Sequence, residues 1–319
     1  MKKVKFKTRK DLKTMAVAFS EDKNEITKDG SFNRQKNYFT GVLGGEEFPA
    51  EAGRYRLIWG EICPWSHRVA IIRRLLGLED VISEGKVYPV RTEKGWRFSL
   101  DAGDRDPVLG IEYLAEIYEQ TDPDYTGRAT IPTIVDLTTE KVISNDYHNI
   151  TTQIESNFTD FIAPDAPELY PENLRSDIDA LNDVLFNEVN NAVYKAGFAK
   201  SQEAYEKNYH LLFNQLDKLE QRLSDRKFLF GDQLTDSDIR LYVTLARFDV
   251  AYYSIFRTNR NRLIDFPNLW RYAKTLYHIP AFHETTNFQS IKMGYSLGNH
   301  AENPRNLLAL GPDTSIWED

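Results

Sequence analysis

The sequence predicts an α+β domain followed by an all-helical domain, and two observations support this division. Between residues 55 and 145, short apolar runs typical of strands alternate with helical stripes and end in a hairpin pattern. Beyond residue 163, apolar residues recur at helical intervals only. We therefore expect an N-terminal extension over residues 1–47, a first domain over 48–162, and a helical domain with a C-terminal tail over 163–319.

The first strand and the first helix follow directly from local patterns. The run YRLIWG from residue 55 is typical of a strand, and PWSHRVAIIRRLLGL at 64–78 places Val69, Ile72 and Leu76 on one helical stripe. Pro64 suits the first turn of a helix because its missing N–H has no partner there in any case. Gly77 suits the end of the same helix.

The rest of the first domain is predicted in the same way. EGKVYPV at 84–90 indicates a second strand, and IEYLAEIYEQ at 111–120 indicates a short helix. Two β-rich runs at 133–136 and 141–144, separated by a polar turn, predict a hairpin, with a further helix after residue 145.

The second half carries the signature of packed helices. Ile178, Leu185 and Val189 recur at helical spacing, and YEKNYHLLFNQLDKLEQRL repeats the pattern. Thr235 and Asp238 form an acidic variant of the capping box, which predicts a helix start. APDAPELYPE at 163–172 is the expected linker.

Composition excludes several classes of function. The net charge of −8 and the pI of about 5.4 disfavour a nucleic-acid surface. A single cysteine in 319 residues allows no internal disulfide, which indicates a reducing compartment. No signal-peptide core or membrane-length apolar run is present, so we expect a cytoplasmic protein without a membrane partner. The six histidines have no ligand spacing, and no metal is expected.

The single cysteine, Cys63, stands where the first strand hands over to the first helix. The unpaired N–H groups and the positive dipole end of a helix stabilise a thiolate at such a position. The dithiol pattern C-x-x-C is reduced here to Cys63-Pro64-Trp65-Ser66, so any thiol chemistry must end with an external small thiol. The alternative from position alone is a buried, inert cysteine.

Pro132 strengthens the functional interpretation of Cys63. In thioredoxin-like folds a cis-proline opens a strand facing the reactive cysteine, and the residue before it offers its backbone to a peptide-like ligand. Pro132 follows Ile131 just ahead of the predicted hairpin. A thioredoxin-like domain joined to an all-helical half best fits the glutathione-transferase fold.

Longer motifs extend this likeness over nearly the whole chain. CPWSHR at 63–68, GWRF at 95–98, TGRATIP at 126–132, NNAVYKAGFA at 190–199, DIRLYVTLARFD at 238–249 and NLLALGP at 306–312 resemble the glutathionyl-hydroquinone reductases, the Xi class of glutathione transferases. The resemblance implies an N-terminal thioredoxin-like domain, a C-terminal all-helical domain and a homodimer. It implies an enzyme that reduces glutathionyl-hydroquinones with glutathione as co-substrate.

The resemblance also implies roles for individual residues. Cys63 is the expected nucleophile, which takes the glutathionyl group as a mixed disulfide that a second thiol resolves. Three tyrosines are expected around the aromatic hydroquinone. The remaining residues implied at the thiol site are Trp96, Arg128, Ile131, Pro132, Asp146 and Tyr147, and the implied tyrosines are Tyr194, Tyr252 and Tyr295, with Tyr253 as a possible misalignment of Tyr252 by one.

One departure from the family pattern concerns the thiol itself. Where the family has Asn-Glu-Ser, this chain has Asn145-Asp146-Tyr147, so a bulky ring replaces a small hydroxyl. The ring either fills the space of the γ-glutamyl end or turns outward and leaves the site intact. Three hypotheses therefore stand: a reductase of glutathionyl-hydroquinones, the same fold and nucleophile with another small thiol, and a non-catalytic protein that binds aromatics.

Overall fold

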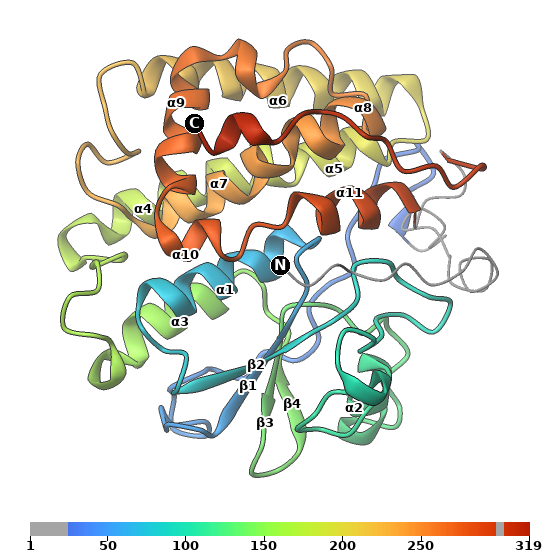
Figure 1. The fold of residues 1–319 in the computed structure, drawn as a ribbon, viewed down its shortest axis with the longest axis vertical. Coiled ribbons are helices and arrows are strands. Elements are labelled where there is room, and N and C mark those ends of the chain that lie inside the picture. Colours follow the sequence, from blue (N-terminus) through green and yellow to red (C-terminus); the bar gives the residue numbers. More distant parts are fainter. Residues whose placement is uncertain (1–24, 298–302) are drawn as a thin grey trace.

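The computed structural model describes residues 25–297 and 303–319. A four-stranded mixed sheet lies on one side of the molecule and a layer of helices on the other, with α1 and α3 between them (Figure 1). The sheet has the order β2-β1-β3-β4; β1 pairs parallel with β2 and antiparallel with β3. The elements of this half are β1 (Tyr55–Trp59), α1 (Pro64–Leu75), β2 (Ile82–Lys86), α2 (Leu114–Thr121), β3 (Thr133–Asp136), β4 (Lys141–Ser144) and α3 (Ile150–Asn157).

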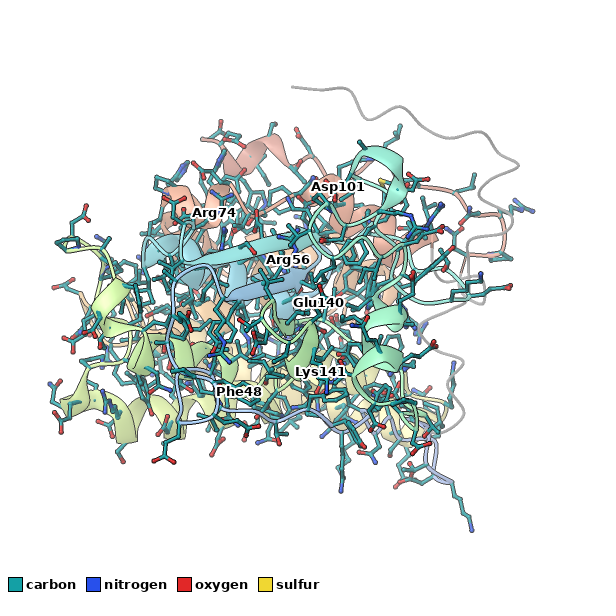
Figure 2. All side chains as sticks on the ribbon, turned by 90° about the horizontal axis from the view of Figure 1, so that it is seen from below. Phe48, Arg56, Arg74, Asp101, Glu140 and Lys141 are labelled. Atoms are coloured by element: carbon teal, nitrogen blue, oxygen red, sulfur yellow. The ribbon has the colours of Figure 1, made fainter. Side chains whose placement is uncertain are left out.

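Burial of both faces explains why the central strands are mostly apolar. All residues of β1 and β3 are buried, which is the pattern of strands that are covered on both sides. Their charged residues are paired: Asp136 of β3 contacts Arg54 at 2.8 Å, and Arg56 of β1 contacts the carboxylate of Asp106 at 2.8 Å. Gly85 lies against that carboxylate, and a side chain at this position would occupy its place. Figure 2 shows Arg56 on the sheet and Glu140 and Lys141 at the hairpin turn.

The second half of the described chain contains helices and no named strand. The long helix α6 lies along its outer side, and α7 runs through its centre (Figure 1). Its elements are α4 (Arg175–Leu185), a π-helical turn (Phe186–Asn190), α5 (Ala192–Gly197), α6 (Gln202–Arg222), α7 (Asp236–Arg247), a second π-helical turn (Phe248–Tyr252), α8 (Tyr253–Ile255), α9 (Pro267–Tyr277), α10 (Pro280–His283) and α11 (Phe288–Leu297).

The capping box predicted from the sequence begins α7. The Asp238 carboxylate accepts hydrogen bonds from the Thr235 backbone N–H at 2.8 Å and from the Thr235 hydroxyl at 3.0 Å. It also accepts the Tyr272 hydroxyl of α9 at 2.9 Å and the Leu229 N–H at 2.9 Å. The box thus ties α7 to a neighbouring helix and to the preceding loop. This matters because every residue of α7 is buried, and a buried helix end needs such partners.

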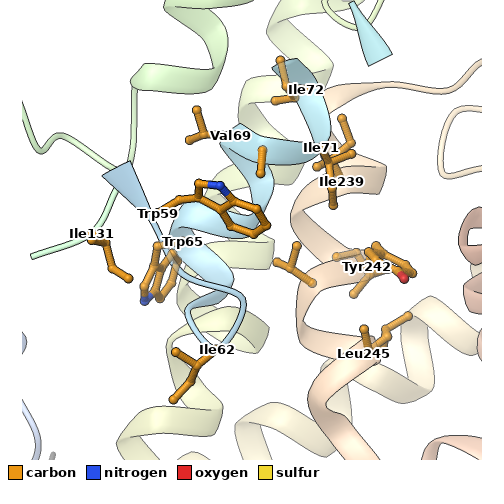
Figure 3. Close-up of a cluster of buried hydrophobic side chains, with 14 of the residues drawn as sticks. Trp59, Ile62, Trp65, Val69, Ile71, Ile72, Ile131, Ile239, Tyr242 and Leu245 are labelled. Carbon is orange, nitrogen blue, oxygen red and sulfur yellow. The ribbon is translucent and has the colours of Figure 1, made fainter. Parts of the chain in front are cut away.

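The two halves meet where α1 packs on α7. Figure 3 shows α1 between Trp59 of β1 and the side chains of Ile239, Tyr242 and Leu245 on α7. These residues are at most 1% exposed. The sheet and the helical half therefore share one hydrophobic core through α1. Burial of each large apolar side chain in this core stabilises the fold by about 1.5–3 kcal/mol.

Two predicted boundaries in the first half are wrong. The second strand, expected at 84–90, covers Ile82–Lys86, because its pairing follows the five residues of β1 and Pro89 cannot donate to a ladder. The helix expected at 111–120 starts only at Leu114, because Tyr113 is its N-cap and Glu116 completes a capping box. The hairpin occupies Thr133–Asp136 and Lys141–Ser144 as expected.

Residues 25–47 contain no helix or strand of any length, as expected of an extension, but they pack along the first half. Gly41 N–H donates to Ile143 O, and Asn145 N–H donates to Phe39 O. Residues 1–24 of the predicted extension lie outside the described part of the chain. Within the described ranges, no helix is long and apolar enough to cross a membrane.

Candidate active site

Cys63 is the N-cap residue of α1 and follows the turn that connects β1 to this helix. Its backbone is extended (φ −81°, ψ 117°), and its carbonyl accepts the N–H of His67 at 3.0 Å. The side chain is half-buried rather than sealed in the core. The alternative of a buried, inert cysteine is therefore wrong in one respect, because the Cys63 side chain is not fully buried. A sulfur at this position faces the positive end of the helix dipole.

The turn that carries Cys63 is closed by Gly60 and Ser66. The Gly60 N–H donates to Ser66 Oγ at 3.2 Å, and the Ser66 hydroxyl lies 3.2 Å from the Gly60 carbonyl. A side chain at residue 60 would collide with Val87 and Ile131, which approach to 2.9 and 3.0 Å of its Cβ position. The glycine thus lets the cysteine turn lie close to the Ile131 loop.

The loop at Ile131 faces the sulfur. The Ile131–Pro132 peptide bond is cis, as expected from the sequence. Cys63 Sγ lies 3.4 Å from the Ile131 carbonyl oxygen, to which the thiol donates a weak hydrogen bond. Backbone groups of Ile131 are therefore within reach of any ligand that bonds to the sulfur.

Cys63 opens into a cavity whose walls come from four parts of the chain. The N-terminal segment supplies Phe32 and Arg34, and the loop after β2 supplies Trp96. The loop before Pro132 and the helical half complete the walls; their lining residues are Arg128 to Ile131 and Tyr194, Phe198 and Tyr295. The predicted residues Cys63, Trp96, Arg128, Ile131, Tyr147, Tyr194 and Tyr295 are thus brought together around one cavity.

The wall beside Ile131 is polar and cationic. Arg128 forms an ion pair with Glu25 at 2.6 Å, and Glu25 is only 5% exposed. Gln35 holds the same loop, because it accepts the Arg128 N–H at 3.0 Å and donates to the Arg128 carbonyl at 3.2 Å. Arg91 stacks over the Trp96 ring at 5.6 Å. These groups suit a ligand with several carboxylates and amides.

Another part of the lining is aromatic and includes two phenols, Tyr194 and Tyr295, which contact the buried Tyr252. The hydroxyls of Tyr194, Tyr252 and Tyr295 form a triangle, in which Tyr252 lies 3.2 Å from each of the others and Tyr194 contacts Tyr295. Burial raises the pKa of Tyr194, and it raises those of Tyr252 and Tyr295 well above the usual value. All three phenols are therefore neutral near pH 7 and able to donate hydrogen bonds.

Arg34 covers the aromatic wall. Its guanidinium lies over the rings of Trp65 and Tyr194 at 5.0 and 4.8 Å, and it donates to Asn191 over 3.4 Å. A guanidinium stacked on aromatic rings is weakly hydrated and keeps its charge. A flat anionic or phenolic guest would meet both the ring faces and this cation.

Three of the predicted residues do not line the cavity. Tyr252 is fully buried behind Tyr194 and Tyr295, and it acts on the cavity only through their hydroxyls. Asp146 is not among the lining residues, and its carboxylate accepts hydrogen bonds from the Asn37 side chain, the His148 N–H and the Asn149 side chain. Pro132 lies behind Ile131, whose side chain and backbone form the wall instead. Tyr253 is excluded as the third phenol, because Tyr252 makes the hydroxyl contacts.

Comparison with known proteins identifies the family. Residues 62–157 match the model "Glutathione S-transferase, N-terminal domain", and residues 202–275 match "Glutathione S-transferase, C-terminal domain". The chain is 38% identical over 299 residues to the Escherichia coli glutathionyl-hydroquinone reductase YqjG, covering 93% of this chain and 87% of YqjG. The chain belongs to the glutathionyl-hydroquinone reductases, the Xi class of the glutathione S-transferases.

Solved Xi-class structures have the same fold. The Xi glutathione S-transferase of Phanerochaete chrysosporium superposes with a TM-score of 0.87 at 38% identity, over 91% of this chain and 95% of that one. The glutathione-bound structure of Escherichia coli YqjG gives a TM-score of 0.81 at 37% identity, over 90% and 95% of the two chains. The predicted glutathione-transferase fold is confirmed, and the protein is an enzyme of this family.

Tyr147 lies inward in this reductase-family site. Its ring lies 5.0 Å from the Trp65 ring and 6.4 Å from Phe186, and it lines the cavity. The interpretation in which the ring turns outward is therefore wrong. Burial raises the pKa of Tyr147, so that its hydroxyl is neutral near pH 7. The ring narrows the cavity where the family pattern has a small serine.

The N-terminal segment contributes cavity residues that sequence reasoning missed. Glu25, Phe32, Arg34 and Gln35 come from a stretch without periodicity, which was read only as an extension. The one available signal is the mixture of aromatic and basic residues in SFNRQKNYF, which does not identify a partner surface by itself.

His67 is a buried residue of α1 and lies outside the cavity. It is fully buried, stacks on Trp59, and lies 3.0 Å from the Thr285 hydroxyl. Burial and the nearby Arg247 cation lower its pKa well below the usual value, so it is neutral and does not serve the cavity. Among the described residues, no group of three or more acidic, histidine or cysteine side chains could hold a metal ion.

His148 gives this part of the molecule a predicted pH dependence. Its ring packs at 4.3 Å from Phe186, and burial lowers its pKa from 6.5 to about 4. Between these values the unfolded chain binds a proton that the folded chain does not, so stability is lost as pH falls from 6.5 to 4. Burial raises the pKa of Glu155, so this group adds stability as the pH falls, opposite to His148. The lowered pKa of His67 removes stability as the pH falls, as that of His148 does. A comparison of two proteins that share both groups isolates His148.

We predict that from pH 7.5 to 5.0 the native protein loses about 1 kcal/mol more of its free energy of unfolding than a His148→Asn variant. A pKa difference of this size between the unfolded and folded states changes the free energy of unfolding by about 2 kcal/mol over this pH range. Because the His148 ring is partly exposed, solvent screening reduces this change to about half. Urea unfolding of both proteins at the two pH values measures the difference. Parallel pH dependences would contradict the assignment.

Proposed function

We propose that this enzyme removes the glutathionyl group from S-glutathionyl hydroquinones, with Cys63 as nucleophile and glutathione as co-substrate. The Cys63 thiolate attacks the sulfur of the thioether. A Cys63–glutathione disulfide forms, the carbon–sulfur bond breaks, and its electron pair goes to the ring carbon, which takes a proton. A second glutathione thiolate then attacks the mixed disulfide, which releases oxidised glutathione and restores Cys63.

The observation that best supports this proposal is that the sulfur shares one cavity with two unlike sets of residues. The Ile131 backbone and the cation of Arg128 suit a peptide-like thiol. The phenols of Tyr194 and Tyr295 suit a hydroquinone. A substrate in which a peptide thiol is joined to an aromatic ring has a partner for each part in this cavity.

The phenols suit the proton transfer that this reaction needs. Tyr194 and Tyr295 line the cavity and are protonated near pH 7, since the ordinary pKa of a phenol is about 10 and burial raises it further. We assign to one of them the proton that goes to the ring carbon. Tyr252 donates to the resulting phenolate from behind, since its hydroxyl is within 3.2 Å of both. It thus has a positioning role rather than a contact with the substrate.

The names of the relatives support this proposal. YqjG is named a glutathionyl-hydroquinone reductase, and a solved structure of it is described as glutathione-bound. The homodimer implied by the resemblance and the cytoplasmic location remain predictions. The non-catalytic alternative, an aromatic-binding protein, is disfavoured by a half-exposed cysteine at the cavity floor.

We predict that Cys63→Ser lowers kcat with a glutathionyl-hydroquinone by at least 1,000-fold, because a neutral hydroxyl cannot form the mixed disulfide (about 4 kcal/mol of barrier). Assay of hydroquinone release by absorbance measures the loss. Binding of free hydroquinone, followed by quenching of tryptophan fluorescence, is expected to be unchanged and serves as the control for folding. Full activity in the serine variant would refute the proposal.

The Tyr147 ring in the cavity lining favours a second candidate function, in which another small thiol replaces glutathione. We predict that Tyr147→Ser lowers the KM for glutathione at least fivefold, because it reopens the space that the ring takes from the γ-glutamyl end. Tyr147→Phe, which keeps the ring and loses only the hydroxyl, is the matched control and is expected to keep the native KM. If cysteine or another small thiol outperforms glutathione in the native protein and the serine variant reverses the order, the second candidate is correct.

A further inference from the structure

We propose that Arg247 is a positioning residue for Cys63, which reaches from the helical half to hold the turn directly before the nucleophile. The inference rests on the proposed function, because it concerns the step in which the Cys63 sulfur attacks. It assigns a role in the chemistry to a side chain that touches neither ligand nor cavity.

Arg247 ends α7 and is fully buried. Its Nη2 donates to the Glu61 carbonyl at 2.7 Å, and its Nε donates to the Ile62 carbonyl at 2.8 Å. These are the two residues immediately before Cys63. A guanidinium presents its N–H groups in a rigid, planar fork, so two neighbouring carbonyls are held in one relative orientation.

The remaining N–H groups of Arg247 fix the guanidinium itself. Nη1 donates to Val243 O at 2.7 Å and to His67 Nδ1 at 3.2 Å. Because His67 accepts at Nδ1, its Nε2 carries the proton, which it donates to Thr285 Oγ1 at 3.0 Å. The Thr285 hydroxyl in turn donates to Ala281 O at 2.7 Å. The fork is therefore anchored to three helices of the molecule, α1, α7 and α10.

Arg247 differs from most of the buried arginines in its partners. Arg56 and Arg240 each pair with an aspartate, and Arg73 pairs with Glu84, whereas Arg68 donates to the Tyr147 carbonyl. Within the described residues, Arg247 has only carbonyl oxygens and a neutral imidazole as partners. A buried cation without a carboxylate is costly unless its hydrogen bonds are well formed. The Glu61 and Ile62 carbonyls thus stabilise the buried charge of Arg247, and the guanidinium in turn fixes the orientation of these carbonyls.

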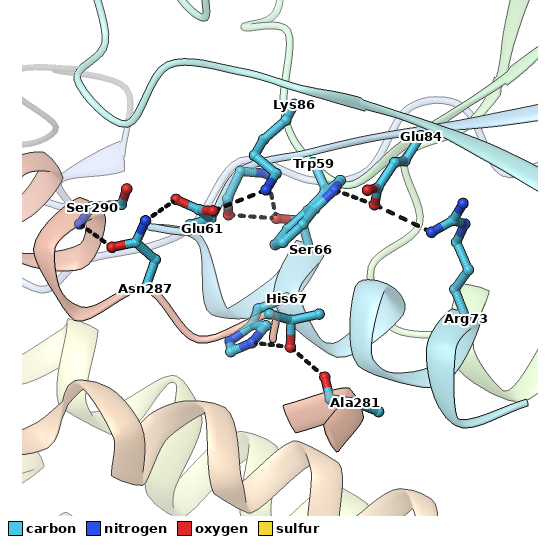
Figure 4. A network of polar contacts seen from close by, with 12 residues as sticks. Trp59, Glu61, Ser66, His67, Arg73, Glu84, Lys86, Ala281, Asn287 and Ser290 are labelled. Atoms are coloured by element: carbon cyan, nitrogen blue, oxygen red, sulfur yellow. Dashed lines mark hydrogen bonds and ion pairs between the residues drawn. The ribbon is translucent and has the colours of Figure 1, made fainter. Parts of the chain in front are cut away.

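A second contact holds the same turn from the side. The Glu61 carboxylate accepts Lys86 Nζ of β2 and Asn287 Nδ2, both at 2.9 Å. Figure 4 shows this network beside His67 and Ser66, between the sheet and the helical half. The side chain of Glu61 is held at the surface and its carbonyl in the core. The peptide before Cys63 consequently has little freedom to rotate.

The charge of Arg247 also acts on two of the phenols. Burial raises the pKa of Tyr252 and Tyr295, and the charge of Arg247 opposes that rise. A shift of about 1 Å in a reacting group can cost about 100-fold in rate, so the relative placement of these groups is expected to appear in kcat.

The test compares Arg247→Lys and Arg247→Met with Arg240→Met. Arg240 is a matched control on the same helix. It is also buried and also crosses to the first half, but it donates to the His148 carbonyl at 3.1 Å and to Thr151 at 2.8 Å, away from the cysteine turn. The measurements are kcat and KM for a glutathionyl-hydroquinone, and the rate of Cys63 alkylation by iodoacetamide on its plateau at high pH.

We predict that Arg247→Met lowers kcat about 100-fold and Arg247→Lys about tenfold, with KM within twofold of the native value. Lysine retains the charge but is a single point donor, so it holds one carbonyl and not both. Alkylation on the plateau stays within threefold, because a small reagent does not require the oriented attack. Arg240→Met keeps the native kcat although it lowers the melting temperature.

Three results would overturn the inference. They are a native kcat in Arg247→Lys, an equal loss of kcat in Arg240→Met, or a rise in KM that accounts for the whole loss in Arg247→Lys. If Arg247→Met does not fold, the lysine variant decides alone. Failure of the proposed function is recognised separately, because Cys63→Ser would then retain activity.

Discussion

The packing of α1 between the sheet and α7 is the constraint on which the rest of the site depends. Residues 64 to 73 of α1 are buried on every side, so the helix cannot shift without opening the core of both halves. Its N-terminus, and with it Cys63, is thereby held at a fixed distance from the Ile131 loop. Because neither half encloses α1 alone, the position of the Cys63 sulfur depends on the contact between the two halves.

The cavity lies where the two halves meet, so its lining combines different kinds of side chain from each half. The first half supplies backbone groups and cations, of which Arg128 is already balanced by Glu25. The helical half supplies neutral phenols, and the N-terminal segment adds Arg34 across the aromatic rings. In the proposed function, a peptide thiol and an aromatic ring are recognised by different parts of the chain and meet at the Cys63 sulfur. Tyr147 adds a ring to the cavity lining and packs against Trp65.

The sequence predicted what depends on local patterns and on motifs. The strand–helix junction at Cys63, the hairpin, the capping box at Thr235 and the membership of the Xi class were all predicted correctly. Long-range pairing was not accessible in this way. The strand β2 starts two residues early because β1 sets its register, and Asp146 is not among the lining residues, its carboxylate accepting hydrogen bonds from the Asn37 and Asn149 side chains. Segment 25–47 has no periodicity, so its place in the cavity wall depends on tertiary contacts that no local pattern records.

The central claim is that Cys63 takes the glutathionyl group from the aromatic substrate before any second thiol acts. Mixing the protein with a stoichiometric amount of glutathionyl-hydroquinone, with no free glutathione present, tests this directly by intact-protein mass spectrometry and peptide mapping. The account predicts one added glutathionyl mass per chain, located on the peptide that contains Cys63, together with one equivalent of released hydroquinone. Release of hydroquinone from an unmodified protein, or an adduct on any other residue, would contradict it.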